Sequence, residues 1–260
     1  MISISSTKTG YITYSDPRFN YSYKGFCSIV CGIIDMALEH YIENDNFNLV
    51  VDEEQTLELF ENISPQTDIF YDMGEHWLKK FFSNQLYQSH YNAHTPANVD
   101  NLKIKNKIYS NIFKIKDKYL KKFEDKRIEL GIDDNTLGIQ IRGTDKKNEL
   151  PELKIDKIFN LIDKFDNQKI FLCTDDKKYL DLILNRYSDR IIYDPSLEIS
   201  SNSQSLHHNC LDRSKINEEV LSSVYLLSTC KYFLYSFSNV SLLALILGVE
   251  NFEFIDYLNK

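Results

Sequence analysis

Glycine and proline are scarce in this sequence, with 8 and 5 occurrences among 260 residues. Most connections between elements are therefore not expected to be glycine-rich linkers. Long hydrophobic runs are lacking as well, because the most apolar run, residues 240–247, is far too short to cross a bilayer. The polar residues 3–10 contain no signal-peptide core. We expect a soluble, cytoplasmic protein without an integral membrane segment.

A basic surplus is missing too, since the formal net charge is −8. Proteins that bind the nucleic-acid backbone normally carry such a surplus, so we expect no nucleic-acid partner. No glycine-rich loop followed by Lys-Ser or Lys-Thr is present, which argues against a nucleoside triphosphatase. The five cysteines have neither a disulfide framework spacing nor a zinc-site spacing. Cys173 and Cys230 lie in apolar segments and are predicted to be buried, reduced thiols.

The composition is that of a globular protein, 43% hydrophobic and 26% charged, and apolar strands alternate with amphipathic helices. This alternation predicts an α/β protein with parallel sheets. The first half opens with a βαβ unit whose turn lies at Gly25, and closes with a long lysine-rich helix that Gly131 ends. Its predicted elements are strands at 10–14 and 48–51, helices at 28–41, around Trp77 and at 108–130, and a loop at 90–101.

We place a domain boundary after that lysine-rich helix, between residues 1–131 and residues 132–260. The pattern of the second domain is more regular. Its predicted strands are 137–141, 169–173, 190–193 and 233–235, and its predicted helices are 155–165, 179–184, 217–228 and 240–247.

Three of these strands end in polar turns: Arg142–Lys146, Thr174–Asp176 and Ser236–Asn239. Because the carboxyl ends of parallel strands meet at one edge of a sheet, we expect the three turns to lie together where α/β proteins bind ligands.

The guanidinium of Arg142 presents a rigid fork of N–H donors that suits phosphate oxygens and stays charged at physiological pH. It would stabilise negative charge on a departing diphosphate. The alternative is a structural ion pair with Asp145 or Asp175.

Asp175 and Asp176 follow a strand and precede a helix, so one of them is expected to cap that helix. The other would hydrogen-bond a base, a ribose or a neighbouring cation. Adjacent carboxylates on a turn point in different directions, which argues against a metal site.

The hydroxyls of Ser236 and Ser238, with the backbone N–H groups that start the next helix, would bind a phosphate. The alternative is a simple helix cap by Ser238 or Asn239. The turn that begins with Gly25 and Phe26 offers a facing site of the same kind.

The segment LGIQIRGTDK at residues 137–146 resembles the first signature of the α-1,6- and nodulation-type fucosyltransferases, His-x-Arg-Arg-x-Asp. The segment IFLCTDDKKYL at 170–180 is similar to that family's strand ending in Thr-Asp-Asp. The segment LLSTCKYFLYSFSNVSLLA at 226–244 is similar to its last motif, a strand followed by a serine-rich turn. Protein O-fucosyltransferases and α-1,2-fucosyltransferases share parts of this pattern.

The resemblance implies two Rossmann-like domains that face a cleft, the GT-B arrangement, with an acceptor-side domain at residues 1–131 and a nucleotide-sugar-binding domain at residues 132–260. It implies GDP-fucose as the donor substrate, a glycan acceptor, inversion at the sugar, and no metal or other cofactor. It also implies that Arg142 contacts the donor diphosphate and that an acid after the first motif is the base, for which Glu149 is the nearest match. The residues expected at the donor site are Gly25, Phe26, Arg142, Lys146, Thr174, Asp175, Asp176, Ser236, Ser238 and Asn239.

The sequence departs from the family's pattern at three places. Gln140 stands at the motif's His, and Gly143 stands at its second Arg. No Asp occurs near Ser223–Val224, where the family has its guanine-binding residue, so the identity of the nucleotide stays open.

Our hypothesis is a glycosyltransferase that moves fucose from GDP-fucose to a glycan or glycoconjugate hydroxyl, with Glu149 or Asp145 as the base. The alternatives are a transferase using another nucleotide-sugar and a non-catalytic nucleotide-sugar-binding protein. A phosphatase of the HAD type ranks last, because no Asp-x-Asp pair follows a strand. The acceptor, the linkage and the oligomeric state are left open.

Overall fold

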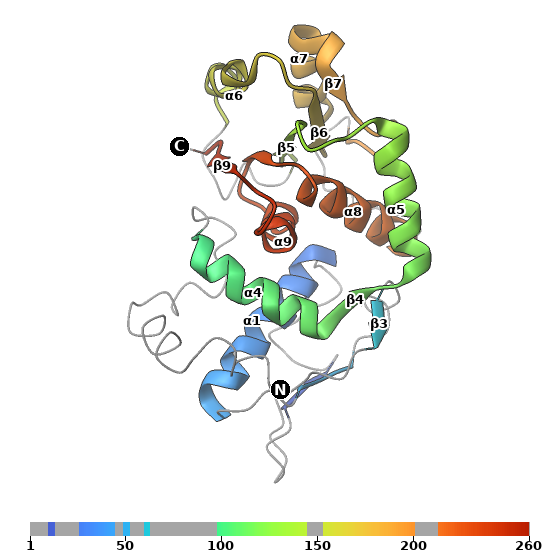
Figure 1. Ribbon diagram of the computed structural model, residues 1–260, viewed down its shortest axis with the longest axis vertical. Coiled ribbons are helices and arrows are strands. Elements are labelled where there is room, and N and C mark those ends of the chain that lie inside the picture. The colour runs from blue at the N-terminus through green and yellow to red at the C-terminus, as the bar shows by residue number, and fades with distance from the viewer. Residues whose placement is uncertain are drawn as a thin grey trace. The chain divides into compact units, whose positions relative to one another are not determined.

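The computed structural model of the chain describes residues 10–13, 26–44, 49–52, 60–62, 98–144, 153–200 and 213–259 (Figure 1). The chain divides into two compact units, Met1–Asn92 with Asn98–Asp117, and Ala93–Ala97 with Lys118–Lys260. The helix expected around Trp77 lies outside the described residues.

The first unit contains the predicted βαβ elements. Strands β1 (Gly10–Thr13) and β2 (Leu49–Asp52) pair in parallel, and helix α1 (Phe26–Asn44) connects them in sequence. The buried positions Val30, Ile34 and Ala37 recur every three to four residues along α1, as expected for a helix with one apolar face.

The long helix predicted over residues 108–130 is wrong. Helix α4 (Val99–Ile112) is followed by strand β4 (Phe113–Ile115), and helix α5 (Asp117–Leu130) begins after it. Strand β4 pairs antiparallel with β3 (Phe60–Asn62). Phe113 and Ile115 are buried and Lys114 between them is exposed, which is the alternation of a strand. The predicted loop at 90–101 is also too long at its end, because Asn98 caps α4 and residue 99 is already helical.

Helix α5 packs within the second unit. Its Phe123 and Tyr225 rings lie 5.9 Å apart, and Tyr225 donates a hydrogen bond to Glu124 at 3.0 Å. The units therefore divide ahead of α5, whereas the domain boundary inferred from the sequence follows that helix; the boundary at residues 131 and 132 stays a prediction. Gly131 ends α5 with a φ of 65°, as predicted for a helix stop.

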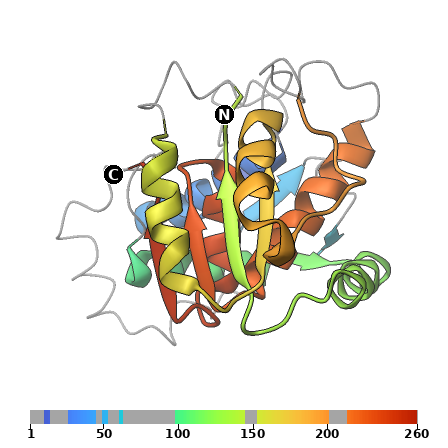
Figure 2. The same ribbon diagram turned by 90° about the horizontal axis from the view of Figure 1, so that it is seen from above.

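The second unit is built on a five-stranded parallel sheet with the order β7-β6-β5-β8-β9 (Figure 2). The prediction of an α/β protein with a parallel sheet is confirmed. The strands are β5 (Leu137–Ile141), β6 (Ile170–Thr174), β7 (Ile191–Ile192), β8 (Tyr232–Tyr235) and β9 (Phe254–Tyr257). Strand β9 was not predicted, because it is short and half-exposed at the edge of the sheet.

Helices cover both faces of this sheet (Figure 2). Ile139 of β5 packs with the apolar sides of α6 and α7 on one face, and Gly138 lies against Leu227 of α8 and the adjacent Cys230 on the other. Helix α9 is apolar nearly all round and buried. The helices are α6 (Ile155–Ile162), α7 (Lys177–Tyr187), α8 (Arg213–Ser228) and α9 (Asn239–Gly248).

The strand order reverses beside β5. The chain builds outward from β5 through β6 to β7, and α8 then returns it to β8 on the other side of β5. Ligands of open α/β sheets bind outside the carboxyl ends of the strands at such a reversal. A ligand site is therefore expected at the carboxyl ends of β5 and β8.

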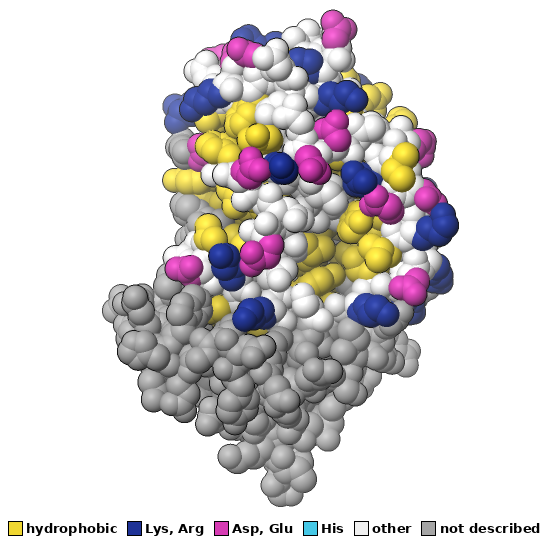
Figure 3. Space-filling view, in the orientation of Figure 1, with side chains coloured by type: hydrophobic (Ala, Val, Ile, Leu, Met, Phe, Trp, Pro, Cys, Tyr) yellow, Lys and Arg dark blue, Asp and Glu magenta, His cyan; other side chains and the backbone are white. Residues whose placement is uncertain are grey.

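The charged surface of α5 and the burial of the cysteines match what the sequence predicts. On the face in Figure 3, Lys and Arg side chains alternate with Asp and Glu, and α5 carries ion pairs such as Lys121–Asp125 at 2.6 Å. Cys173 and Cys230 are free and buried, as predicted, and burial raises the pKa of the Cys230 thiol to about 12. Among the helices of the described ranges, none has both the length and the apolar composition of a membrane span.

Gly131→Ala tests the left-handed helix stop. The added Cβ has room, since its nearest neighbour is Lys169 Nζ at 3.5 Å, but a φ of +65° disfavours a side chain. We expect the free energy of unfolding to fall by about 1 kcal/mol in urea titrations. Gly131→Asn, which tolerates this conformation better, should lose less. An alanine variant as stable as the parent would contradict this account.

Candidate functional site

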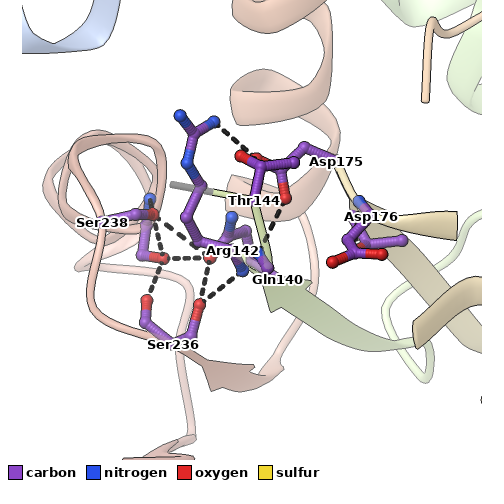
Figure 4. Close-up of polar contacts among 10 residues, drawn as sticks. Gln140, Arg142, Thr144, Asp175, Asp176, Ser236 and Ser238 are labelled. Carbon is purple, nitrogen blue, oxygen red and sulfur yellow. Dashed lines mark hydrogen bonds and ion pairs between the residues drawn. The ribbon is translucent and has the colours of Figure 1, made fainter. Parts of the chain in front are cut away.

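The three polar turns that follow β5, β6 and β8 lie together, as the sequence predicts (Figure 4). Arg142 joins the other two turns. Its backbone N–H donates to Ser236 Oγ at 2.7 Å, and its Nη1 lies 2.7 Å from Asp175 Oδ2. The end of β5 is thus tied to β8 through its backbone and to β6 through its side chain.

The guanidinium of Arg142 points toward Asp175 in Figure 4. The two side chains are 17% and 13% exposed, so the ion pair is largely removed from water but still reachable from solvent. The pairing with Asp175 that the sequence left open as an alternative is present. A guanidinium has five N–H donors, so a partner for Nη1 orients the group and does not by itself prevent it from binding an anion.

Asp175 accepts hydrogen bonds from three groups of the turn after β5. Besides Arg142, Gly143 N–H donates to Oδ1 at 2.8 Å and Thr144 Oγ donates to Oδ2 at 2.7 Å. A carboxylate is an acceptor only, and these donors occupy both of its oxygens. Asp175 therefore holds the Arg142–Thr144 turn in place.

The neighbouring Asp176 caps helix α7. Its Oδ1 accepts the Lys178 N–H at 2.9 Å, and the residue is 2% exposed. Its own N–H donates to Thr174 Oγ at 3.3 Å. The prediction that one of the two adjacent carboxylates caps the following helix is confirmed, and the structure assigns that task to Asp176.

The serine-rich turn after β8 is turned inward. Ser236 and Ser238 are 2% and 3% exposed, and their hydroxyls lie 3.2 Å from Gln140 Oε1. Ser238 also caps α9, because its Oγ accepts the Ser241 N–H at 3.1 Å, which confirms the alternative of a helix cap. Asn239 is the first residue of α9.

Sequence reasoning missed two members of this network, Gln140 and Ser241. Gln140 is buried in β5 at 4% exposure, and Ser241 Oγ lies 2.5 Å from its Oε1. The signal was a single amide in the apolar strand LGIQI, because a buried amide needs hydrogen-bond partners.

At Gly143, where the resembled motif has its second Arg, the structure leaves no room for a side chain. A Cβ there would lie 2.5 Å from Asp176 Cβ and 2.9 Å from Tyr179 Cδ2. The glycine is required by the close approach of the turn to α7.

Four of the predicted site residues, Gly25, Asp145, Lys146 and Glu149, lie outside the described residues. Phe26 is the first residue of α1 in the other unit and is buried. Within the described ranges, no three His, Cys, Asp or Glu side chains are grouped so that they could hold a metal ion.

The second unit is an open parallel α/β sheet with helices on both faces and a reversal of strand order beside β5. No sequence-family model and no curated protein sequence matches the chain. Solved structures do. A NodZ alpha-1,6-fucosyltransferase soaked with GDP-fucose matches with a TM-score of 0.52 at 13% identity, over 86% of this chain and 89% of that one.

Two further structures agree. A mutant of Arabidopsis thaliana FUT1 in complex with GDP matches with a TM-score of 0.53 at 13% identity, over 92% of this chain and 69% of that one. A NodZ fucosyltransferase from Bradyrhizobium matches with a TM-score of 0.50 at 14% identity, over 85% of this chain and 88% of that one. The chain has the fold of these fucosyltransferases, so the resemblance is confirmed for the fold. The facing of two Rossmann-like domains across a cleft stays a prediction.

Gly143→Ala tests the close approach. The methyl group would force Asp176 or Tyr179 to move, and we expect a loss of about 1–3 kcal/mol in the free energy of unfolding, measured by denaturant titration. Gly138→Ala in β5 is the comparison. Its Cβ would meet Cys230 and Leu227 at 3.3 Å, so its loss should be smaller. Equal losses in the two variants would refute the role of Gly143.

Proposed function

We propose that the protein is a glycosyltransferase that moves fucose from GDP-fucose to a glycan or glycoconjugate hydroxyl. The observation that carries the proposal is the position of Arg142, at the carboxyl end of β5 beside the strand reversal, with its backbone bonded to Ser236. The fold it shares with NodZ and FUT1, which were solved with GDP-fucose and GDP, supports the same class of donor.

The proposed reaction is a single displacement with inversion. The acceptor hydroxyl oxygen bonds to the anomeric carbon of fucose as the bond from that carbon to the β-phosphate oxygen breaks. The hydroxyl proton passes to a carboxylate, Glu149 or Asp145, and GDP leaves with the bonding electron pair.

Arg142 would stabilise the departing diphosphate. The charge that develops on the leaving oxygens is matched by a guanidinium that Asp175 already orients at 2.7 Å. A preorganised donor needs no rearrangement at the moment of reaction. The N-terminus of α9, which carries a partial positive charge, adds to this stabilisation. These two groups take the place of a divalent metal in the proposal.

A second candidate is a nucleotide-sugar-binding protein without turnover, or a transferase with another nucleotide-sugar donor. Gly143 motivates the protein without turnover, because the turn has one guanidinium where the resembled motif has two, and the structure closes the space of the second. The lack of an Asp near Ser223–Val224 motivates another donor.

The first test is nucleotide release by the purified full chain with GDP-fucose, GDP-mannose and UDP-glucose, with and without EDTA. We expect release from GDP-fucose to exceed release from the other donors by at least about tenfold, which corresponds to 1.4 kcal/mol of discrimination. EDTA should leave the rate unchanged. Binding of GDP without release from any donor would favour the second candidate.

The second test is removal of the Arg142 fork. Arg142→Ala should lower kcat/KM for GDP-fucose by about 10²–10³-fold, as for loss of one transition-state donor. Arg142→Lys should recover little, since an ammonium lacks the planar fork. Arg186→Ala is the matched control, because Arg186 pairs with Asp163 on the exposed surface at 2.8 Å. Full activity in Arg142→Ala would remove the mechanism.

A further inference from the structure

Gln140 places an amide side chain inside the second unit, in a strand that is otherwise apolar. The side chain of Gln140 is 4% exposed, and the residues paired with it on the two adjacent strands are Cys173 of β6 and Tyr235 of β8. The mechanism proposed above gives it no chemical task. Such a group stays in a core only where hydrogen bonds satisfy it.

Three serine hydroxyls surround the amide oxygen (Figure 4). Ser236 and Ser238 lie 3.2 Å from Gln140 Oε1, and Ser241 lies 2.5 Å from it. Ser241 Oγ is also 2.9 Å from Ser238 Oγ. All four residues are buried.

The direction of these bonds follows from the backbone. Ser236 Oγ accepts the Arg142 N–H at 2.7 Å, and Ser238 Oγ accepts the Ser241 N–H at 3.1 Å. Each hydroxyl still has its own proton to donate. Ser236 and Ser238 donate to the Gln140 oxygen, and the single proton of Ser241 is shared between that oxygen at 2.5 Å and the Ser236 carbonyl at 2.6 Å.

The result is one continuous path between two groups of the proposed donor site. It runs from the Arg142 N–H through Ser236, Gln140 and Ser238 to the Ser241 N–H in the first turn of α9. Gln140 is the central residue of this path, because its oxygen accepts hydrogen bonds from both Ser236 and Ser238.

We infer that Gln140 is a positioning residue, which fixes the first turn of α9 relative to Arg142 and so sets the affinity of the site for the donor nucleotide. The inference rests on the proposed function. The hydroxyls of Ser236, Ser238 and Ser241 all lie at the Gln140 oxygen, so we infer that the turn acts through the backbone groups that Gln140 holds in place.

A histidine, the residue of the resembled motif at this position, would not replace Gln140 in this network. A neutral imidazole has one acceptor nitrogen with one lone pair, whereas the path needs an acceptor for two hydroxyls. Gln140 and the serines of the turn are therefore matched to one another in this chain.

Gln140→Met is the test variant, because methionine has a similar length but no amide acceptor. The buried Ser236 hydroxyl would then lose its acceptor, whereas Ser238 can donate to Ser241 and Ser241 to the Ser236 carbonyl. A buried hydroxyl without an acceptor is costly, and movement of the turn relieves that cost. We expect GDP to bind about tenfold more weakly by calorimetry. We also expect faster amide hydrogen exchange in the peptide covering residues 236–242. Gln140→Asn, whose amide is one methylene too short, should show both effects in the same direction, and it serves if the methionine variant does not fold.

Thr136→Val is the matched control. Thr136 is fully buried just before β5, at the amino ends of the strands and so away from the site. Its Oγ accepts the Asp133 N–H and donates to Asp133 Oδ1, both at 3.0 Å. It should lower the thermal midpoint without changing GDP affinity or exchange at 236–242.

Unchanged exchange at 236–242 in the Gln140 variants overturns the inference, whether or not the protein binds GDP. Faster exchange with unchanged GDP affinity also overturns it, as does an equal loss of affinity in Thr136→Val. If the parent protein binds no nucleotide, the proposed function fails, and so does the claim that Gln140 sets the affinity for the nucleotide. The exchange result then decides by itself whether Gln140 positions the first turn of α9.

Discussion

One hydrogen bond, from the Arg142 N–H to Ser236 Oγ at 2.7 Å, joins the carboxyl ends of β5 and β8 at the point where the strand order reverses. Beyond its last ladder bond, a strand has backbone groups that still need partners, and at a buried strand end side chains must supply them. Ser236 does so here, and its own proton leads on to Gln140. The position of the Arg142 backbone and the start of α9 both follow from this arrangement, whereas Asp175 orients the Arg142 side chain.

The two adjacent carboxylates after β6 do different work because successive residues of an extended segment point in opposite directions. Asp176 turns into α7 and caps it, while Asp175 faces the end of β5 and accepts three donors there. The pair links two strand ends and one helix without exposing an unpaired acid. A guanidinium that is already oriented in this way loses little freedom when it binds an anion, which favours tight contact with a diphosphate.

Gly143 and Gln140 show how this chain departs from the motif it resembles. The turn approaches α7 so closely that a second guanidinium has no space. The amide oxygen of Gln140 lies within hydrogen-bonding distance of three serine hydroxyls. One departure removes a positive charge, and the other replaces a titratable ring with a neutral double acceptor. Among the described residues, the proposed site therefore relies on the Arg142 guanidinium and on backbone donors held by a neutral network.

The sequence alone determined the parallel α/β sheet, because LGIQI and KIFLC are continuous apolar runs typical of strands buried on both faces. It also determined that a helix stops at Gly131 and that a carboxylate caps α7. The apolar strand pattern, the helix stop and the helix cap can each be recognised within a few consecutive residues. Only the tertiary structure decided that Phe113–Ile115 form a strand, since their partner lies at 60–62, and that Arg142 pairs with Asp175 and Gln140 with the serines. Such choices are made between segments far apart in the chain, where local periodicity carries no information about which group supplies the missing hydrogen bond.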